Sequence, residues 1–297
     1  TEEGNWEASM DPSGGTPGRV NSCLMENRDT IPPRLAGIGI EAKDWIRIWF
    51  SEKMDSTTLL DPGLYNLEPH EGHATIVLPA GDFYHSVLVR LPFPLEEAAS
   101  YQLALTGGVT DCAGNEMDAG ARLPAGLPAI ADNMDIVINE ILLDPSDPGA
   151  AFIELYNRTD RFFDIKDLVL ARMDTVRLVL TSVQAISDES YLLAPGRYMV
   201  LSPDPFAVIR HYHCPDPDAF VKMSGWPVFS REASVIVLAC RHDEKVIDQV
   251  YYRESLHFDL GSNPEGVSLD RIHFSRPSWD DTNWHSASQS SGYAAPG

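Results

Sequence analysis

Short runs in which apolar and polar residues alternate with a period of two are the feature that most constrains this chain. In residues 44–50, for example, Ile46, Ile48 and Phe50 fall on one face, and the intervening side chains fall on the other. The 22 Pro and 21 Gly separate such runs at intervals typical of β-sandwiches. We expect further strands within residues 85–91, 101–105, 136–143, 152–156, 198–201, 234–240 and 246–252.

Helix signals are confined to one stretch, from Ser202 to His211, where a serine precedes Pro203 and Pro205 as a candidate cap. Strands do not alternate with long helices, so the pattern excludes a Rossmann fold or an α/β barrel. The fold class predicted from the pattern is therefore all-β.

The net charge of the chain limits the classes of partner that it can bind. The chain carries 22 Lys and Arg against 44 Asp and Glu, a net charge of −22. The excess is spread over the chain, because residues 1–134 hold 8 basic and 20 acidic residues and residues 135–297 hold 14 and 24. Such a surface repels phosphate backbones and anionic membranes, so we expect no nucleic-acid partner. It is compatible with divalent cations and cationic partners.

No run approaches the roughly 18–20 apolar residues of a membrane span, so we expect no transmembrane segment. Residues 1–4 (TEEG) lack the basic and apolar regions of a signal peptide, and we interpret the chain as an excised mature segment.

The four cysteines fall two in each half of the chain, and none belongs to a CxxC motif. Two interpretations remain open, two disulfides within the halves or four buried thiols. From the two-by-two division we predict the pairs Cys23–Cys112 and Cys214–Cys240, which would indicate an oxidising, extracytoplasmic compartment.

Residues 121–133 are rich in Ala, Gly and Pro and lack periodicity, which predicts a short linker between two domains. A sequence repeat indicates a third part of the chain, which precedes the two domains. Asn5-Trp6, Ala8-Ser9 and Pro17-Gly18 are matched near the other end by Asn283-Trp284, Ala287-Ser288 and Pro296-Gly297. We interpret residues 1–28 as the tail of a preceding copy of the C-terminal domain, followed by a linker. Two similar loops would be the simpler interpretation.

Residues 29–120 resemble the bacterial SbsA-type Ig-like domain. The resemblance lies in DTIPP at 29–33, FSEKMD at 50–55 and DCAGN at 111–115, in that order. Phe50 would fill the core, and the Ala-Gly-Asn turn would reverse the chain before the last strand.

Residues 134–297 resemble a lamin-tail domain of the kind found in bacterial surface proteins. The matching segments are IVINEI at 136–141, AFIELYN at 151–157, LAPGRYMVL at 193–201, GVSLDR at 266–271 and the Asn-Trp tail. This resemblance implies an Ig-like β-sandwich and a non-catalytic interaction or spacer module, and it names no ligand. Together the two resemblances imply tandem Ig-like sandwiches joined by the linker.

The sequence contains no GxGxxG, GxxxxGK[ST], HExxH, GxSxG or EF-hand pattern. We therefore predict no enzyme and no obligatory cofactor. Calcium is the metal considered, with Asp144 and Asp147 as candidate ligands in an acidic loop, although solvated turns are the preferred explanation of such loops.

Glu140 and Glu154 lie inside predicted strands, where a buried carboxylate must be paired or hydrogen-bonded. We assign both a structural role, with Glu154 tying down a neighbouring loop. A general acid–base pair is the alternative.

Trp45, Arg47 and Trp49 share one strand face, with the indoles about 13 Å apart, and form a candidate surface for sugars or a protein. A neighbouring strand or the next domain would also cover such a face. The sequence thus predicts an extracytoplasmic, non-catalytic scaffold whose partners are proteins or surface glycans. The rival hypothesis is a carbohydrate- or calcium-binding accessory module of an extracellular hydrolase.

Overall fold

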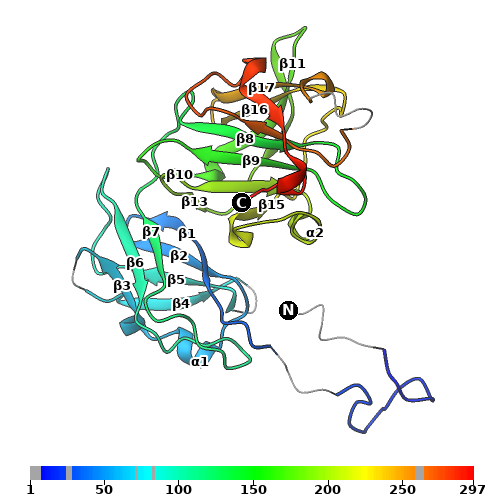
Figure 1. Cartoon of the computed structure of the whole chain (residues 1–297). Helices are drawn as coiled ribbons and strands as arrows, with labels where there is room; N and C mark the ends of the chain where they lie inside the picture. The colour runs from blue at the N-terminus through cyan, green and yellow to red at the C-terminus, as the bar shows by residue number, and fades with distance from the viewer. Residues whose placement is uncertain (1–7, 25–28, 71, 82–83, 258–263) are drawn as a thin grey trace.

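The computed structural model describes residues 8–24, 29–70, 72–81, 84–257 and 264–297. Its regular structure is almost entirely antiparallel β-sheet, so the predicted all-β fold is confirmed. Figure 1 shows two β-structured halves that follow one another along the chain, with residues 8–24 as an extension beside them. The longest helix described has seven residues, and none of the described helices is long and apolar enough to cross a membrane.

The first half is a sandwich of two sheets. One has the order β1-β2-β5-β4, formed by Leu35–Ala42, Trp45–Phe50, Ser86–Arg90 and Ile76–Ala80. The other has the order β3-β6-β7, formed by Tyr65–Glu68, Tyr101–Leu105 and Arg122–Ala125. Ile46, Ile48 and Phe50 of β2 enter the core between them, as the alternation predicted. A one-turn helix, α1 (Ser56–Leu59), is capped by Asp55.

The second half places a six-stranded sheet against a four-stranded one. The six-stranded order is β15-β14-β9-β8-β18-β19, formed by Phe220–Lys222, Tyr198–Ser202, Phe152–Asn157, Ile136–Leu142, Leu269–Arg271 and Trp284–Ser286. The four-stranded order is β12-β11-β16-β17, formed by Val179–Ala185, Leu168–Asp174, Ala233–Cys240 and Val246–Arg253. A two-stranded piece, β10 (Phe163–Asp164) with β13 (Leu192–Leu193), completes it.

The outer face of the six-stranded sheet is covered as well. Ile153 and Leu155 of β9 point into the core between the sheets, whereas Phe152 packs outside with Val208 of α2 (Pro205–His211) and with Ala294. Both faces of β9 are therefore enclosed, and β9 is a central strand. The cap of α2 is Asp204, whose side chain accepts the Ala207 N–H at 3.2 Å. The expected cap at Ser202 is wrong, because Ser202 still belongs to β14.

Two expectations about the connections differ from the structure. Residues 122–125 of the predicted 121–133 linker form strand β7, which pairs with β6 of the first half. In addition, the core of the first half includes Phe162 and Leu192 of the second. The two halves thus share apolar packing at the point where only a short linker was expected.

The predicted disulfides are not formed, since none of the four cysteines is bonded to another in the described chain. Cys214 lies with the apolar cluster outside the six-stranded sheet, and Cys240 lies in the core on the sheet's other side. A layer of side chains and backbone separates them. Cys112 lies in the DCAGN turn, where its thiol faces the Met54 carbonyl oxygen at 3.6 Å, and Cys23 belongs to the N-terminal extension.

Candidate functional site

The junction between the two halves is built on two glycines of β1. The Tyr191 hydroxyl donates to the Ala36 carbonyl oxygen at 2.6 Å. A Cβ atom at Gly37 would lie 2.2 Å from the Tyr191 ring, and one at Gly39 would lie 2.0 Å from the Ser190 carbonyl oxygen. Only glycine permits the second half to approach this closely.

Asp164 holds Ser190 and Tyr191, the two residues that contact β1, in place through hydrogen bonds. Its side chain accepts the Tyr191 N–H at 3.0 Å and also accepts the Ser190 hydroxyl proton. The same Ser190 oxygen accepts the Ile40 N–H of β1 at 2.8 Å. Burial raises the pKa of Asp164, and the hydrogen bonds from Ser190, Lys166 and Tyr191 work against that shift. A chain of hydrogen bonds thus runs from β1 into the second half.

The predicted ligand-binding face lies at this junction. Trp49 packs against Tyr191 with ring centroids 5.2 Å apart. Arg47 lies 5.6 Å from the Trp49 ring centroid and pairs with Glu41 at 2.8 Å and with Glu189 of the second half at 3.4 Å. Trp45 is half-buried on the same face. The second half of the same chain therefore takes up part of the surface that the sequence assigns to a ligand.

An ion pair and two small pockets lie at the rim of the junction. Arg34 donates to both carboxylate oxygens of Asp218, at 2.7 and 3.0 Å. Two pockets of about 260 and 330 Å³ open beside the contact, and both are lined in part by Ala36, Tyr191 and Asp218. Both volumes lie close to the lower end of the range of about 300–1,000 Å³ that small-molecule sites occupy. The arrangement connects the two halves through hydrogen bonds, an ion pair and apolar contacts.

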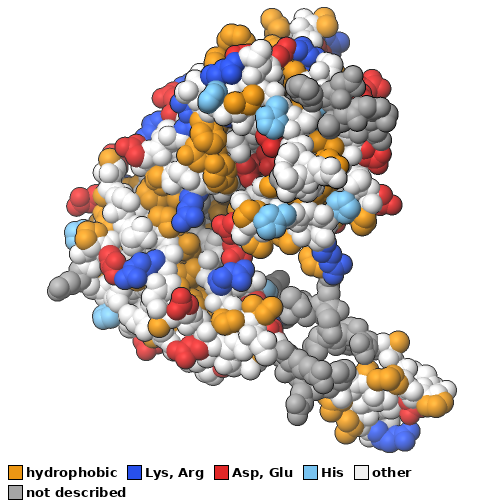
Figure 2. Space-filling model, viewed as in Figure 1, with side chains coloured by type: hydrophobic (Ala, Val, Ile, Leu, Met, Phe, Trp, Pro, Cys, Tyr) orange, Lys and Arg blue, Asp and Glu red, His pale blue; other side chains and the backbone are white. Residues whose placement is uncertain are grey.

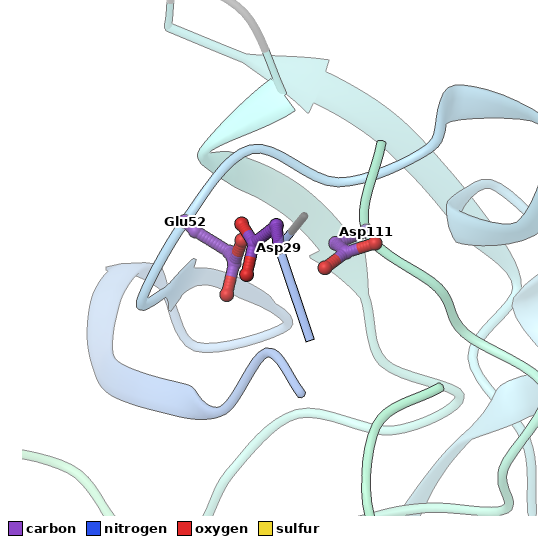
Figure 3. Close-up of side chains that lie close together, drawn as sticks. All are labelled: Asp29, Glu52 and Asp111. Atoms are coloured by element: carbon purple, nitrogen blue, oxygen red, sulfur yellow. The ribbon is translucent and has the colours of Figure 1, made fainter. Parts of the chain in front are cut away.

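Three carboxylates of the first half meet in an acidic cluster of Asp29, Glu52 and Asp111 (Figure 3). Their nearest oxygens all lie within 4.8 Å of one another. Burial opposes ionisation of Asp111, but hydrogen bonds from Asn115, Ala113 and Gly114 lower its pKa. Burial raises the pKa of Glu52, and the charges of Asp29 and Asp111 raise it further.

The acidic cluster unites the three motifs of the first half, DTIPP, FSEKMD and DCAGN, each of which contributes one carboxylate. The sequence suggested these motifs only as signatures of a fold; their shared acidic residues were the missed signal. Oxygen donors suit hard cations, but calcium takes six to eight of them. Three carboxylates by themselves do not make a metal site.

Glu154, Glu140 and Asp270 form a carboxylate row on the outer face of the six-stranded sheet. Glu140 of β8 lies opposite Glu154 of β9 on one side and opposite Asp270 of β18 on the other. Glu140 and Glu154 are only 5% and 3% exposed. Burial, and then the charges of Asp270 and Glu154, raise the pKa of Glu140 to about 8. Burial also raises the pKa values of Glu154 and Asp270.

The end of the described chain covers the carboxylate row. The Ala295 N–H donates to Glu140 Oε1 at 3.2 Å, and the Gly297 N–H donates to Glu154 Oε2 at 2.7 Å. Asn139 donates to the other oxygen of Glu154 at 2.7 Å, and Ser268 donates to Asp270 at 3.0 Å. These are the backbone and side-chain donors that a buried carboxylate requires. A structural role for Glu140 and Glu154 remains our prediction.

The candidate calcium ligands do not converge. Asp144 pairs with Arg231 at 2.7 Å, and Asp147 is exposed. In the part of the chain that the structure describes, neither belongs to a group of three side chains close enough to share one ion.

No protein-family model matches the chain, and no curated protein is significantly similar to it. Solved structures with some likeness include the N-terminal part of the bacterial S-layer protein SbsC, at 11% identity and a TM-score of 0.29. The match covers 75% of this chain but only 44% of that one. A DUF4876 family protein from Bacteroides thetaiotaomicron is 14% identical with a TM-score of 0.30, over 80% of this chain and 91% of the other. At these values, function has to be argued from the residues.

Proposed function

We propose that the chain is a non-catalytic structural module of a secreted or cell-surface protein, in which two Ig-like sandwiches are held in a fixed relative orientation. The proposed units are an SbsA-type Ig-like domain over residues 29–120 and a lamin-tail domain over residues 134–297. The sequence motifs of the two halves support these assignments. Other proteins or surface glycans would be the partners of such a module.

The observation that carries the proposal is the seating of Ser190 and Tyr191 on the two glycines of β1. Hydrogen bonds, an aromatic contact and shared apolar packing all cross this junction. Halves that moved freely would need no such fit, because mobile domains usually meet through looser, more polar contacts. A spacer that transmits position and force between neighbouring parts of a protein requires a rigid connection between its own domains.

The rival hypothesis of a glycan-binding accessory module relies on Trp45, Arg47 and Trp49. Since Trp49 and Arg47 contact the second half, a sugar ring would have to displace Tyr191 and Glu189 to stack there. This contact is the reason for preferring the structural module.

Small-angle X-ray scattering on the whole chain tests the proposal. The wild type should give a scattering curve that one fixed arrangement of the halves explains. Gly39→Ala should enlarge the radius of gyration, because the added Cβ meets the Ser190 carbonyl oxygen. Gly15→Ala is the matched control, since the nearest atom to its Cβ would be Pro17 Cδ at 3.9 Å.

Circular dichroism should show that Gly39→Ala retains its β-structure. A wild-type curve that requires independently moving halves, or catalytic turnover by the purified chain, would contradict the proposed function.

A further inference from the structure

The sheet surface around the carboxylate row, here termed the groove, binds the backbone of the segment lying over it. Residues 287–297, here termed the closing segment, offer N–H groups from alternate residues, Ala295 to Glu140 and Gly297 to Glu154. Pro296 lies between them and has no N–H that the groove would leave unpaired. The spacing of the donors in the segment thus matches two adjacent strands of the sheet.

Glycine is required at the end of the closing segment. Gly297 has a φ of +106°, in a region that other residues avoid, and a Cβ there would lie 2.8 Å from the Asp216 carbonyl oxygen. The order Pro-Gly is therefore a structural requirement of this groove. Further back, Ala294 is fully buried among Phe152 and Val208, which anchors the segment to the outer apolar cluster.

Residues 8–18 repeat the Ala-Ser and Pro-Gly pairs of the closing segment. Ala8-Ser9 and Pro17-Gly18 are separated by seven residues, as are Ala287-Ser288 and Pro296-Gly297, so the two segments align without a gap. The preceding Trp6 lies outside the described residues, and the comparison does not depend on it.

The backbone conformations also correspond. Gly14 and Tyr293 occupy equivalent positions with φ values of +83° and +69°, and Gly18 and Gly297 do so with +74° and +106°. Each segment also forms a hydrogen-bonded turn before the Pro-Gly pair, from the Gly14 N–H to the Asp11 carbonyl oxygen and, displaced by one residue in the alignment, from the Gly292 N–H to the Gln289 carbonyl oxygen.

The first copy is presented to solvent. Residues 8–24 form the extension seen in Figures 1 and 2, and Met10, Val20 and Leu24 are 67%, 72% and 71% exposed. Hydrogen bonds of Ser9, Asp11 and Ser13 join residues of the extension to one another.

We propose that residues 8–18 are a second closing segment, which fits the groove over Glu140 and Glu154 of a lamin-tail-like unit other than the one it precedes in this chain. The N–H groups of Thr16 and Gly18 would take the places of those of Ala295 and Gly297. The partner is thus a preceding unit of the same kind, because in this chain residues 287–297 already occupy the groove. The inference relies on the proposed structural role only for its biological use, and its failure would leave the fixed junction intact.

A chimera of the whole chain tests the fit directly. Residues 287–297 are replaced by the sequence of residues 8–18, which has the same length, and thermal unfolding is compared with the wild type. We expect Tm to fall by only about 3 °C, mainly because Gly15 takes the place of the buried Ala294. A chimera carrying the same eleven residues in scrambled order is the control, and its Tm should fall by at least twice as much.

A second pair of variants reports on the glycine. Gly297→Val should lower Tm in the wild type and by a similar amount in the chimera, because the same close approach to Asp216 is required in both. The proposal is overturned if the chimera is as unstable as the scrambled control. It is also overturned if the scrambled control is as stable as the chimera, since the groove would then not select the segment, or if Gly297→Val affects the wild type alone.

Discussion

Glu140 is a carboxyl group that the fold keeps protonated at neutral pH. Its folded-state pKa of about 8 lies above its ordinary value of 4.5, because it is buried between Glu154 and Asp270. The folded chain therefore binds a proton that the unfolded chain releases between those two pH values. Stability should fall as pH rises through this window and change no further above it, at up to about 1.4 kcal/mol per pH unit.

The expected result is that Glu140→Gln flattens the dependence of stability on pH between about 5 and 8. Glutamine retains an acceptor for the Ala295 N–H and has no proton to lose. Urea unfolding midpoints measured across this range would check it. If the slope of stability against pH were unchanged in Glu140→Gln, other titrating groups would determine the pH dependence.

Glu154 tests the structural role of the carboxylate row. It accepts the Gly297 N–H and the Asn139 amide, which a leucine would leave unpaired inside the protein. We expect Glu154→Leu to cost about 1–3 kcal/mol and Glu154→Gln clearly less, because glutamine keeps one acceptor oxygen. Chemical denaturation measures both. If Glu154→Leu were fully stable but abolished a measurable activity, the residue would be catalytic or ligand-binding.

Glu52 belongs to the other group of carboxylates. Its raised pKa means that its ionised form is disfavoured next to Asp29 and Asp111. Glu52→Gln should therefore stabilise the chain at pH 7, by less than about 1 kcal/mol because the site is partly solvated, and the gain should vanish as acid protonates Glu52. Thermal melts in a chelating buffer measure this. A loss of stability that appears only in calcium would show instead that a cation uses this carboxylate.

At the level of elements, one buried ion pair joins the two sheets of the second half. Arg271 of β18 donates to Asp248 of β17 at 3.2 Å, and their side chains are 0% and 3% exposed. Arg271 also donates to the Ile138 carbonyl oxygen of β8 at 2.7 Å, while Asp248 accepts the Ile138 N–H at 2.8 Å. Three strands from two sheets thus meet in one polar network.

Arg271→Met should cost about 3–5 kcal/mol, because it leaves the Asp248 carboxylate buried without its cation. Adding Asp248→Asn should recover much of this loss, since asparagine keeps an acceptor for the Ile138 N–H and carries no charge. Urea unfolding of the single and double variants gives the coupling. Additive losses would show that the two charges do not depend on each other.

At the scale of the whole molecule, the chain should be stable without covalent cross-links. A disulfide closing the loop between Cys214 and Cys240 would contribute about 3.5 kcal/mol, but these cysteines lie on opposite sides of the six-stranded sheet. We therefore expect the same Tm with and without a reducing agent. Peptide mapping under non-reducing conditions is the direct check, and a Cys214–Cys240 or Cys23–Cys112 cross-link would contradict this arrangement.

The sequence by itself located eight strands, namely β2, β5, β6, β8, β9, β14, β16 and β17, and the faces of those that alternate. Alternation in residues 45–50 and 152–156 places Ile48 in one core and Ile153 in another, as found. These are local properties, because successive side chains of a strand point to opposite sides whatever the strand pairs with. The strands that the pattern did not predict include β1, β4, β11 and β12. In β1, two glycines interrupt the alternation that marks a strand.

Only the tertiary structure decided which residues meet. Tyr191 finds the Ala36 carbonyl oxygen 155 residues away in the chain, and Glu140 finds both Glu154 and Asp270 because β8 lies between β9 and β18. Local pattern limits each strand to two faces, but the choice of neighbours depends on the free energy of packing the whole chain. Glu140, Gly39 and Tyr191 thus acquired their roles from strand order and sheet packing.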